Sequence, residues 1–275
     1  MREQQPLSKK PKLVLLFNPV TEWIDTTHVM RMWIHEKSLR EGEEEGTPAS
    51  KERIKTFVDT YGINISRPIH DPKDPSKAVV VADSRVVAYG SVAETKKLWV
   101  KGTEFTISNL VMDVQLGRDF ADAAVAIDGK IKAFRSLPGD YYQVDPVALQ
   151  SHVNILTQNA RSYVVVETES FGDVLFVAIG ATNVGTVRIY DKFQNLKQKV
   201  CKGDEIGYFQ FGGSSIIVAF QKGRVRFDQD LLDLSRLRIQ VSVEVGMSLG
   251  RAQLGWKNWS NARVTRSSSL FSWIF

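Results

Sequence analysis

The chain has 275 residues, of which 43% are hydrophobic and 24% are charged, and its formal net charge is +5. This length and balance allow a sizeable buried core, and they exclude a wholly disordered chain and a multi-spanning membrane protein. The single cysteine, Cys201, cannot form an intramolecular disulfide. It therefore excludes a disulfide-stapled fold and a cysteine-rich zinc site, and it favours a reducing intracellular compartment.

Residues 19–62 have the spacing of two amphipathic helices. The first helix, which Pro19 opens, repeats four residues on one face: Trp23, Thr27, Met30 and Ile34. The second, which Gly62 ends, repeats Ile54, Phe57, Val58 and Tyr61. The acidic run at residues 41–45 separates them as a solvated linker. The sequence therefore predicts an N-terminal helical pair.

After Pro75 the pattern changes to short β-branched or aromatic runs, most of them separated by Gly, Asp, Asn or Ser. These runs are Ala78–Val81, Val86–Tyr89, Leu98–Val100, Tyr163–Glu167, Val174–Ile179, Val187–Tyr190, Ile206–Phe211, Ile216–Phe220 and Arg238–Val245. Many short strands with frequent turn signals favour a sandwich or barrel over βαβ units. We therefore expect the α+β class: an N-terminal helical pair followed by a mainly antiparallel β core, sandwich-like or barrel-like.

The charge pattern points to an anionic partner without a nucleic-acid motif. The basic excess lies near both ends of the chain, where it either aids solubility or attracts an acidic lipid surface. The apolar end, residues 270–275, fits a bilayer interface, a buried tail or a frayed one. No run reaches the roughly 18 apolar residues of a transmembrane helix. The four histidines have no metal-ligand spacing, so we expect no metal site: His28, His35, His70 and His152.

Residues 212–215, Gly-Gly-Ser-Ser, stand between two apolar strands and allow two interpretations. The simpler one is a hairpin, in which glycine supplies positive φ and serine supplies local hydrogen bonds. The other is a self-cleaving peptide bond. A serine Oγ attacks the preceding carbonyl to give an ester, and elimination and hydrolysis then leave a pyruvoyl group at the new N-terminus. The glycine before the serine leaves the approach unobstructed, and the hydroxyl needs an adjacent base.

The run Phe211 to Ile216 resembles the processing motif of the phosphatidylserine decarboxylase family, in which the second serine is often threonine. Further resemblance covers residues 66–250, between a helical region at 1–65 and a tail at 251–275. The blocks that carry it are Val81–Arg85, Trp99–Gly102, Leu137–Pro146, Val177–Gly185 and Lys202–Gly207.

The resemblance implies a carboxy-lyase that converts phosphatidylserine to phosphatidylethanolamine with a pyruvoyl group derived from Ser214. Ser214 would be the self-cleavage nucleophile, and Gly213 would end the larger fragment. Asp83 matches the aspartate of the family's charge-relay triad; on its own it also fits a turn aspartate beside Ser84. The implied partners are phosphatidylserine and a phospholipid membrane surface, with no nucleic acid. The implied location is intracellular and peripheral to a membrane, and a homodimer is left open.

The chain departs from the family where the triad histidine should lie. The family carries an Asp-Tyr-His-Arg-aromatic-His-Ser-Pro stretch there, whereas this chain runs from Ile127 directly into Asp128. A second join, at Ile65–Ser66, lacks an Asn-Glu-Phe-Phe-Arg-type segment. Two clean excisions with intact flanks indicate an exon-skipped transcript or a faulty gene model. His152 lies where the family has no catalytic histidine, so we interpret it as a packed or surface residue.

Two alternatives follow from these observations. A relative acting on free aromatic amino acids can also carry Gly-Gly-Ser-Ser, and the basic ends favour a lipid only weakly. The missing histidine block supports an unprocessed, inactive homologue that binds an anionic membrane or a partner.

Overall fold

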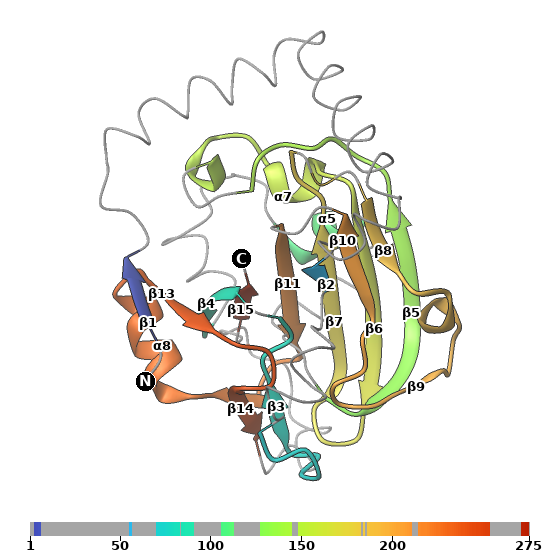
Figure 1. The fold of residues 1–275 in the computed structure, drawn as a ribbon, viewed down its shortest axis with the longest axis vertical. Helices are drawn as coiled ribbons and strands as arrows, with labels where there is room; N and C mark the ends of the chain where they lie inside the picture. Colours follow the sequence, from blue (N-terminus) through green and yellow to red (C-terminus); the bar gives the residue numbers. More distant parts are fainter. Residues whose placement is uncertain are drawn as a thin grey trace, which may run out of the picture.

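The central sheet of the computed structural model has nine strands in the described part of the chain (Figure 1). Neighbouring strands pair antiparallel throughout. In sheet order they are β1 (Glu3–Pro6), β13 (Ile239–Val243), β4 (Ser84–Tyr89), β15 (Phe271–Ile274), β11 (Ser215–Phe220), β7 (Gly172–Ile179), β6 (Arg161–Thr168), β5 (Gly129–Leu137) and β9 (Lys199–Val200). The structure describes residues 3–6, 55–56, 70–82, 84–90, 106–112, 127–144, 148–182, 184, 186–210, 214–253 and 271–274.

Two three-stranded sheets accompany the central one. The first consists of β2 (Lys55–Thr56), β10 (Gly207–Gln210) and β8 (Thr186–Ile189), and the second of β12 (Val225–Phe227), β14 (Ser248–Ala252) and β3 (Lys77–Val79). Figure 1 shows β8 and β10 lying over β6 and β7, and the Ser162 hydroxyl on β6 donates to the Val187 carbonyl on β8 at 3.5 Å. The predicted antiparallel β core is confirmed, and this part of it is a sandwich of two sheets.

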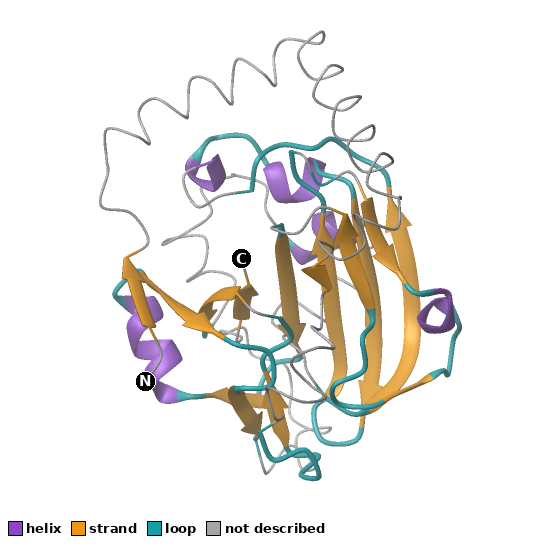
Figure 2. Cartoon of the chain, viewed as in Figure 1, coloured by secondary structure: helices purple, strands orange, loops and turns teal. Residues whose placement is uncertain are grey.

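Three short helices gather at the end of the central sheet where β11 begins (Figure 2). They are α5 (Ile107–Val111), η2 (Ala148–Gln150) and α7 (Ile155–Gln158). The Thr106 hydroxyl caps α5 by accepting the amide of Asn109 at 3.0 Å. The two other described helices, η3 (Asp191–Gln194) and α8 (Gln229–Arg236), lie away from this end.

The middle strands are apolar without alternation because both of their faces are covered. Every residue from Val174 to Ile179 on β7 has no exposed surface, and the same holds for residues 217–220 on β11. The Phe171 and Phe220 rings stack with their centroids 5.2 Å apart. Close packing on both faces fixes the register of β7 and β11, since a slip of one residue would turn every side chain to the opposite face, where it no longer fits its packed neighbours.

The predicted N-terminal helical pair lies mostly outside the described residues. The prediction of the second helix can be compared with the structure only at Lys55–Thr56. There it is wrong, because these residues form β2 and pair with β10. The free edge of β10 offers main-chain hydrogen bonds to any passing segment, and this long-range pairing overrides a local helical pattern. Residues 271–274 of the apolar C-terminal run form β15, which lies between β4 and β11 in the central sheet.

Ser235 on α8 supports a stability prediction. Its buried hydroxyl accepts the amide of Ala88 on β4 at 2.8 Å, so Ser235→Ala leaves a buried N–H without that acceptor. We expect a loss of about 1–3 kcal/mol in the free energy of unfolding, measured by urea denaturation. The control is Arg236→Ala, since Arg236 is exposed and its ion pair, within the described part of the chain, is with the exposed Asp233; its effect should stay below about 1 kcal/mol. Equal effects would contradict this account.

Candidate active site

The Gly-Gly-Ser-Ser segment connects two different sheets. The strand before it, β10, pairs with β2 and β8, whereas β11 after it pairs with β7 and β15. The hairpin interpretation is therefore wrong, because β10 and β11 do not pair with each other. The connection passes from one layer of the sandwich to the other, and Gly213 within it lies outside the described residues.

Ser214 is the first described residue after this crossing. The residue is 8% exposed, and its hydroxyl makes a short hydrogen bond to the carbonyl oxygen of Ile179, the last residue of β7. This carbonyl is the only partner of the hydroxyl in the described part of the chain. A carbonyl orients the hydroxyl but cannot take its proton, so the contact positions Ser214 without activating it.

Ile179 lies between two polar residues in one cross-strand row. It pairs with Ser215 on β11 and with Arg161 on β6. Directly opposed residues of antiparallel strands present their side chains on the same face. The Ser215 and Arg161 side chains therefore lie on one face of the sheet, two strands apart, next to the candidate cleavage bond.

The buried side chain of Asn159 joins three segments at this end of the sheet. Asn159 has no exposed surface, and its Oδ1 accepts the amide of Tyr142 at 2.9 Å. Its Nδ2 donates to the carbonyls of Tyr142 and Gly180, both at 2.8 Å. Gly180 directly follows Ile179, whose carbonyl accepts the Ser214 hydroxyl. The Asn159 side chain therefore fixes the end of β7 at which that carbonyl lies.

The guanidinium of Arg161 is buried against backbone carbonyls. Arg161 is 2% exposed, and it donates to the carbonyls of Leu110 at 2.5 Å, Asn159 at 2.8 Å and Asn109 at 3.3 Å. Burial lowers the pKa of Arg161 to about 10, so the group is still charged at neutral pH. All of its hydrogen bonds within the described residues go to carbonyls, which ties α5 to the end of β6 and leaves its charge without a carboxylate partner.

Two of the sequence blocks singled out above meet here. A Cβ on Gly139 would lie 2.1 Å from the carbonyl oxygen of Gln158, so only glycine fits this close approach. The Thr182 hydroxyl donates to the Tyr141 carbonyl at 2.7 Å, which links the 137–146 block to the 177–185 block. Burial raises the pKa of the Tyr141 phenol, so it is neutral and cannot act as a base for Ser214.

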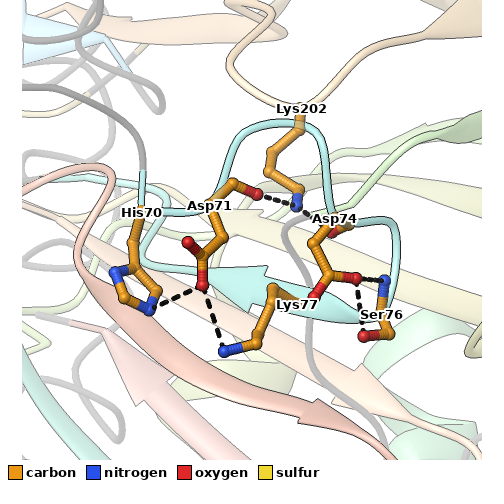
Figure 3. Close-up of polar contacts among 6 residues, drawn as sticks. All are labelled: His70, Asp71, Asp74, Ser76, Lys77 and Lys202. Carbon is orange, nitrogen blue, oxygen red and sulfur yellow. Dashed lines mark hydrogen bonds and ion pairs between the residues drawn. The ribbon is translucent and has the colours of Figure 1, made fainter.

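Beyond the join at Ile127–Asp128, the chain is packed into the fold. Ile127 is 3% exposed, and the Asp128 carboxylate accepts the amide of Lys202 at 2.8 Å. The Lys202 ammonium donates to the carbonyls of Asp74 at 2.7 Å and Asp71 at 3.4 Å (Figure 3). Desolvation lowers the pKa of this lysine, although the nearby aspartates, Asp128 first, oppose the shift. The Lys202 block therefore anchors the downstream flank of the join.

Asp83 lies outside the described residues, but the strand that follows it is placed. Val86 on β4 and Ile216 on β11 both pair with Ile274 on β15. As both pairings are antiparallel, β4 and β11 run in the same direction with their first residues at one end of the sheet. Ser84, which begins β4, and Ser214, which directly precedes β11, thus lie level with each other two strand positions apart, at a separation of roughly 10 Å.

No described histidine contacts Ser214. His70 is half exposed and pairs with Asp71 at 3.2 Å (Figure 3), and His152 is exposed, in agreement with its interpretation as a surface residue. His28 and His35 lie outside the described residues. Within the described ranges no group of three or more ligands could hold a metal ion, and no helix is long and apolar enough to cross a membrane.

The sequence interpretation missed Asn159 and Arg161. The available signal was a pair of polar residues just before the β-branched run Tyr163–Glu167, since polar residues that enter a buried strand need hydrogen-bond partners. Periodicity alone could not show which carbonyls they contact.

Comparisons with known proteins give a consistent result. The family model described as phosphatidylserine decarboxylase matches residues 123–251. Phosphatidylserine decarboxylase proenzyme 2 of Oryza sativa subsp. japonica is 37% identical over 72% of this chain and 34% of its own length. The proenzyme of Fusobacterium nucleatum is 32% identical over 76% of this chain and 81% of its own, and proenzyme 3 of Schizosaccharomyces pombe is 30% identical over 78% and 26%. The chain thus spans about a third of the rice relative and most of the bacterial one.

The Asn159 hydrogen bonds give a second stability prediction. Asn159→Ala removes three of them and leaves a buried amide and two carbonyls without those partners. We expect a loss of about 3 kcal/mol or more in the free energy of unfolding, measured by urea denaturation. Asn195→Ala is the matched control, because Asn195 is exposed and, among the described residues, its side chain donates to the Asp191 carbonyl alone. An unchanged midpoint for Asn159→Ala would remove Asn159 from the account.

Proposed function

Because the chain belongs to the phosphatidylserine decarboxylase family, we propose that it is a proenzyme for the conversion of phosphatidylserine to phosphatidylethanolamine. The pyruvoyl group that serves this reaction comes from Ser214, after cleavage of the bond between Gly213 and Ser214. The proposed catalytic part is residues 66–250. The observation that carries the proposal is the placement of Ser214: buried, at a crossing between two sheets, with its hydroxyl oriented by the Ile179 carbonyl.

The residues around position 214 fit a pyruvoyl group. After cleavage, residue 214 becomes a chain end, and β11 still holds it through six consecutive pairs with β7, from Ser215–Ile179 to Phe220–Val174. The fragment that begins at residue 214 also supplies β15, next to β11. Pairing on both edges keeps the new end in place. When present, the pyruvoyl carbonyl supplies an electron sink for the loss of carbon dioxide.

In the proposed mechanism this chain supplies the orientation for self-cleavage and lacks the base. The Ile179 carbonyl holds the Ser214 hydroxyl. Asp83, immediately before β4, would orient and support an imidazolium between the two strand ends. The roughly 10 Å between the starts of β4 and β11 leaves room for such a ring, with one hydrogen bond to each side. A carboxylate such as that of Asp83 is by itself too weak a base to take the proton from the Ser214 hydroxyl.

The proposed site of action is a membrane surface inside the cell. The substrate is a lipid, and the net charge of +5 favours a surface that carries anionic headgroups. Cys201 is a free, exposed thiol, in keeping with a reducing compartment. The lipid assignment is tested by measuring carbon dioxide release in two assays, one with vesicles that contain phosphatidylserine and one with free aromatic amino acids. Preference for the soluble amino acid would overturn it.

The third prediction concerns the chain as it stands. Without the triad histidine, cleavage between Gly213 and Ser214 should be slower by several orders of magnitude than in a processed relative. A denaturing gel of the purified protein should therefore show mostly uncleaved chain. Efficient cleavage would show that another group supplies the base, and His152→Ala and His70→Ala would then identify or exclude these two.

The fourth prediction concerns a chain with the histidine block restored between Ile127 and Asp128. It should split at Gly213–Ser214, and Ser214→Ala should abolish the split because no Oγ remains to attack. Asp83→Asn should slow it by roughly 100-fold or more, because the imidazole loses its orienting charge. Time courses on denaturing gels measure all three rates. Asp233→Asn, at an exposed position of α8, is the matched control and should leave the rate unchanged.

A cleavage rate that does not respond to Asp83→Asn would remove Asp83 from the site. Cleavage that survives Ser214→Ala would overturn the proposed function itself.

A further inference from the structure

The hydroxyl of Ser215 is buried and has no hydrogen-bond partner among the residues that the structure describes. The residue has no exposed surface, and the other buried serines in the described part of the chain all use their hydroxyls. Those serines are Ser151, Ser162, Ser214 and Ser235. A buried, unpaired hydroxyl lowers stability, and alanine would fill the position without that cost. The residue type at this position is therefore not explained by the stability of the uncleaved chain.

Ser215 lies beside the bond proposed to break. It is the first residue of β11 and follows Ser214 directly. Successive residues of a strand point to opposite faces, so its side chain lies on the face of Arg161 rather than that of Ser162. On that face Arg161 already donates to carbonyls, and Ile179 between them is apolar. The row thus provides no partner for the hydroxyl while the chain is uncleaved.

The first step of self-cleavage changes the hydrogen-bonding groups at the nitrogen of residue 214. Ser214 Oγ adds to the carbonyl carbon of Gly213, the bond from that carbon to the Ser214 nitrogen breaks, and the hydroxyl proton ends on the nitrogen. The products are an ester at Oγ and a free amine. An amide nitrogen has one donor and no acceptor, whereas the amine has two donors and one lone pair. A new donor and a new acceptor therefore form one residue away from the unpaired hydroxyl.

We propose that Ser215 is a positioning residue for self-cleavage, whose hydroxyl is unpaired in the amide form and binds the amine of residue 214 in the ester form. The hydrogen bond exists only after the acyl shift, so it favours the ester without stabilising the starting state. This inference rests on the proposed function, because it assumes that the Ser214 ester forms.

The test measures ester formation and stability separately on the 275-residue chain. Neutral hydroxylamine cleaves esters, and over days it traps whatever ester forms even when the shift is slow; the chain has no Asn-Gly bond that the reagent would attack. Mass spectrometry measures the fraction cut between Gly213 and Ser214. For Ser215→Ala we expect about tenfold less cleavage, which corresponds to the loss of one hydrogen bond. Its melting temperature should equal or exceed that of the parent. Ser215→Thr retains the hydroxyl and should restore cleavage.

Ser235→Ala is the matched control, since it removes a buried hydroxyl that is bonded to Ala88. It should lower the melting temperature and leave hydroxylamine cleavage unchanged well below that temperature. The inference is overturned if Ser215→Ala is cut as fast as the parent, or if it loses as much stability as Ser235→Ala. If the parent gives no cleavage that depends on Ser214, the same variants are compared in the chain with the histidine block restored. If that chain gives none either, the proposed function fails and this inference fails with it.

Discussion

The double pairing of Ile179 is the constraint on which the candidate site depends. At this one residue β7 pairs with β11 on one side and with β6 on the other, and its carbonyl accepts the Ser214 hydroxyl. Burial of β7 on both faces prevents a slip in register, so the positions of Ser214, Ser215 and Arg161 follow from the packing of the strand. The Asn159 hydrogen bond to Gly180 then fixes the point at which β7 ends.

The same constraint explains why the serine is placed on a connection between sheets. A hairpin turn would satisfy its own backbone groups and stand in solvent, where water competes for every hydrogen bond. A crossing into a fully buried strand holds the serine at 8% exposure beside a carbonyl that belongs to neither flanking strand. Orientation of this kind supplies proximity without strain in the regular strands. It leaves the chemistry dependent on a base from elsewhere.

Local sequence patterns predicted the described strands that have β-branched runs, whereas the predicted strand Leu98–Val100 lies outside the described residues. The role of Ser214 stays a prediction. They failed at β5, where Lys130, Lys132 and Arg135 interrupt the apolar pattern and a bulge shifts the register, and at α8, a short amphipathic stretch between strands. They also failed at Lys55–Thr56, where pairing with β10 decides the conformation. The contacts of Arg161 with Asn109 and Leu110 span about fifty residues, and no local pattern encodes such a pairing.

The chain is thus a family member whose proposed nucleophile, Ser214, is oriented by the Ile179 carbonyl and whose sequence has no histidine block. Asp128 and Lys202 anchor the flank of the join. With the block restored, Ser214 should become a carbonyl-bearing chain end. Peptide mapping by mass spectrometry, with a hydrazide label for carbonyls, tests this. We expect a fragment that begins at residue 214, lacks a free amine and takes up one label. A fragment that begins with an intact serine, or a cut at another bond, would contradict it.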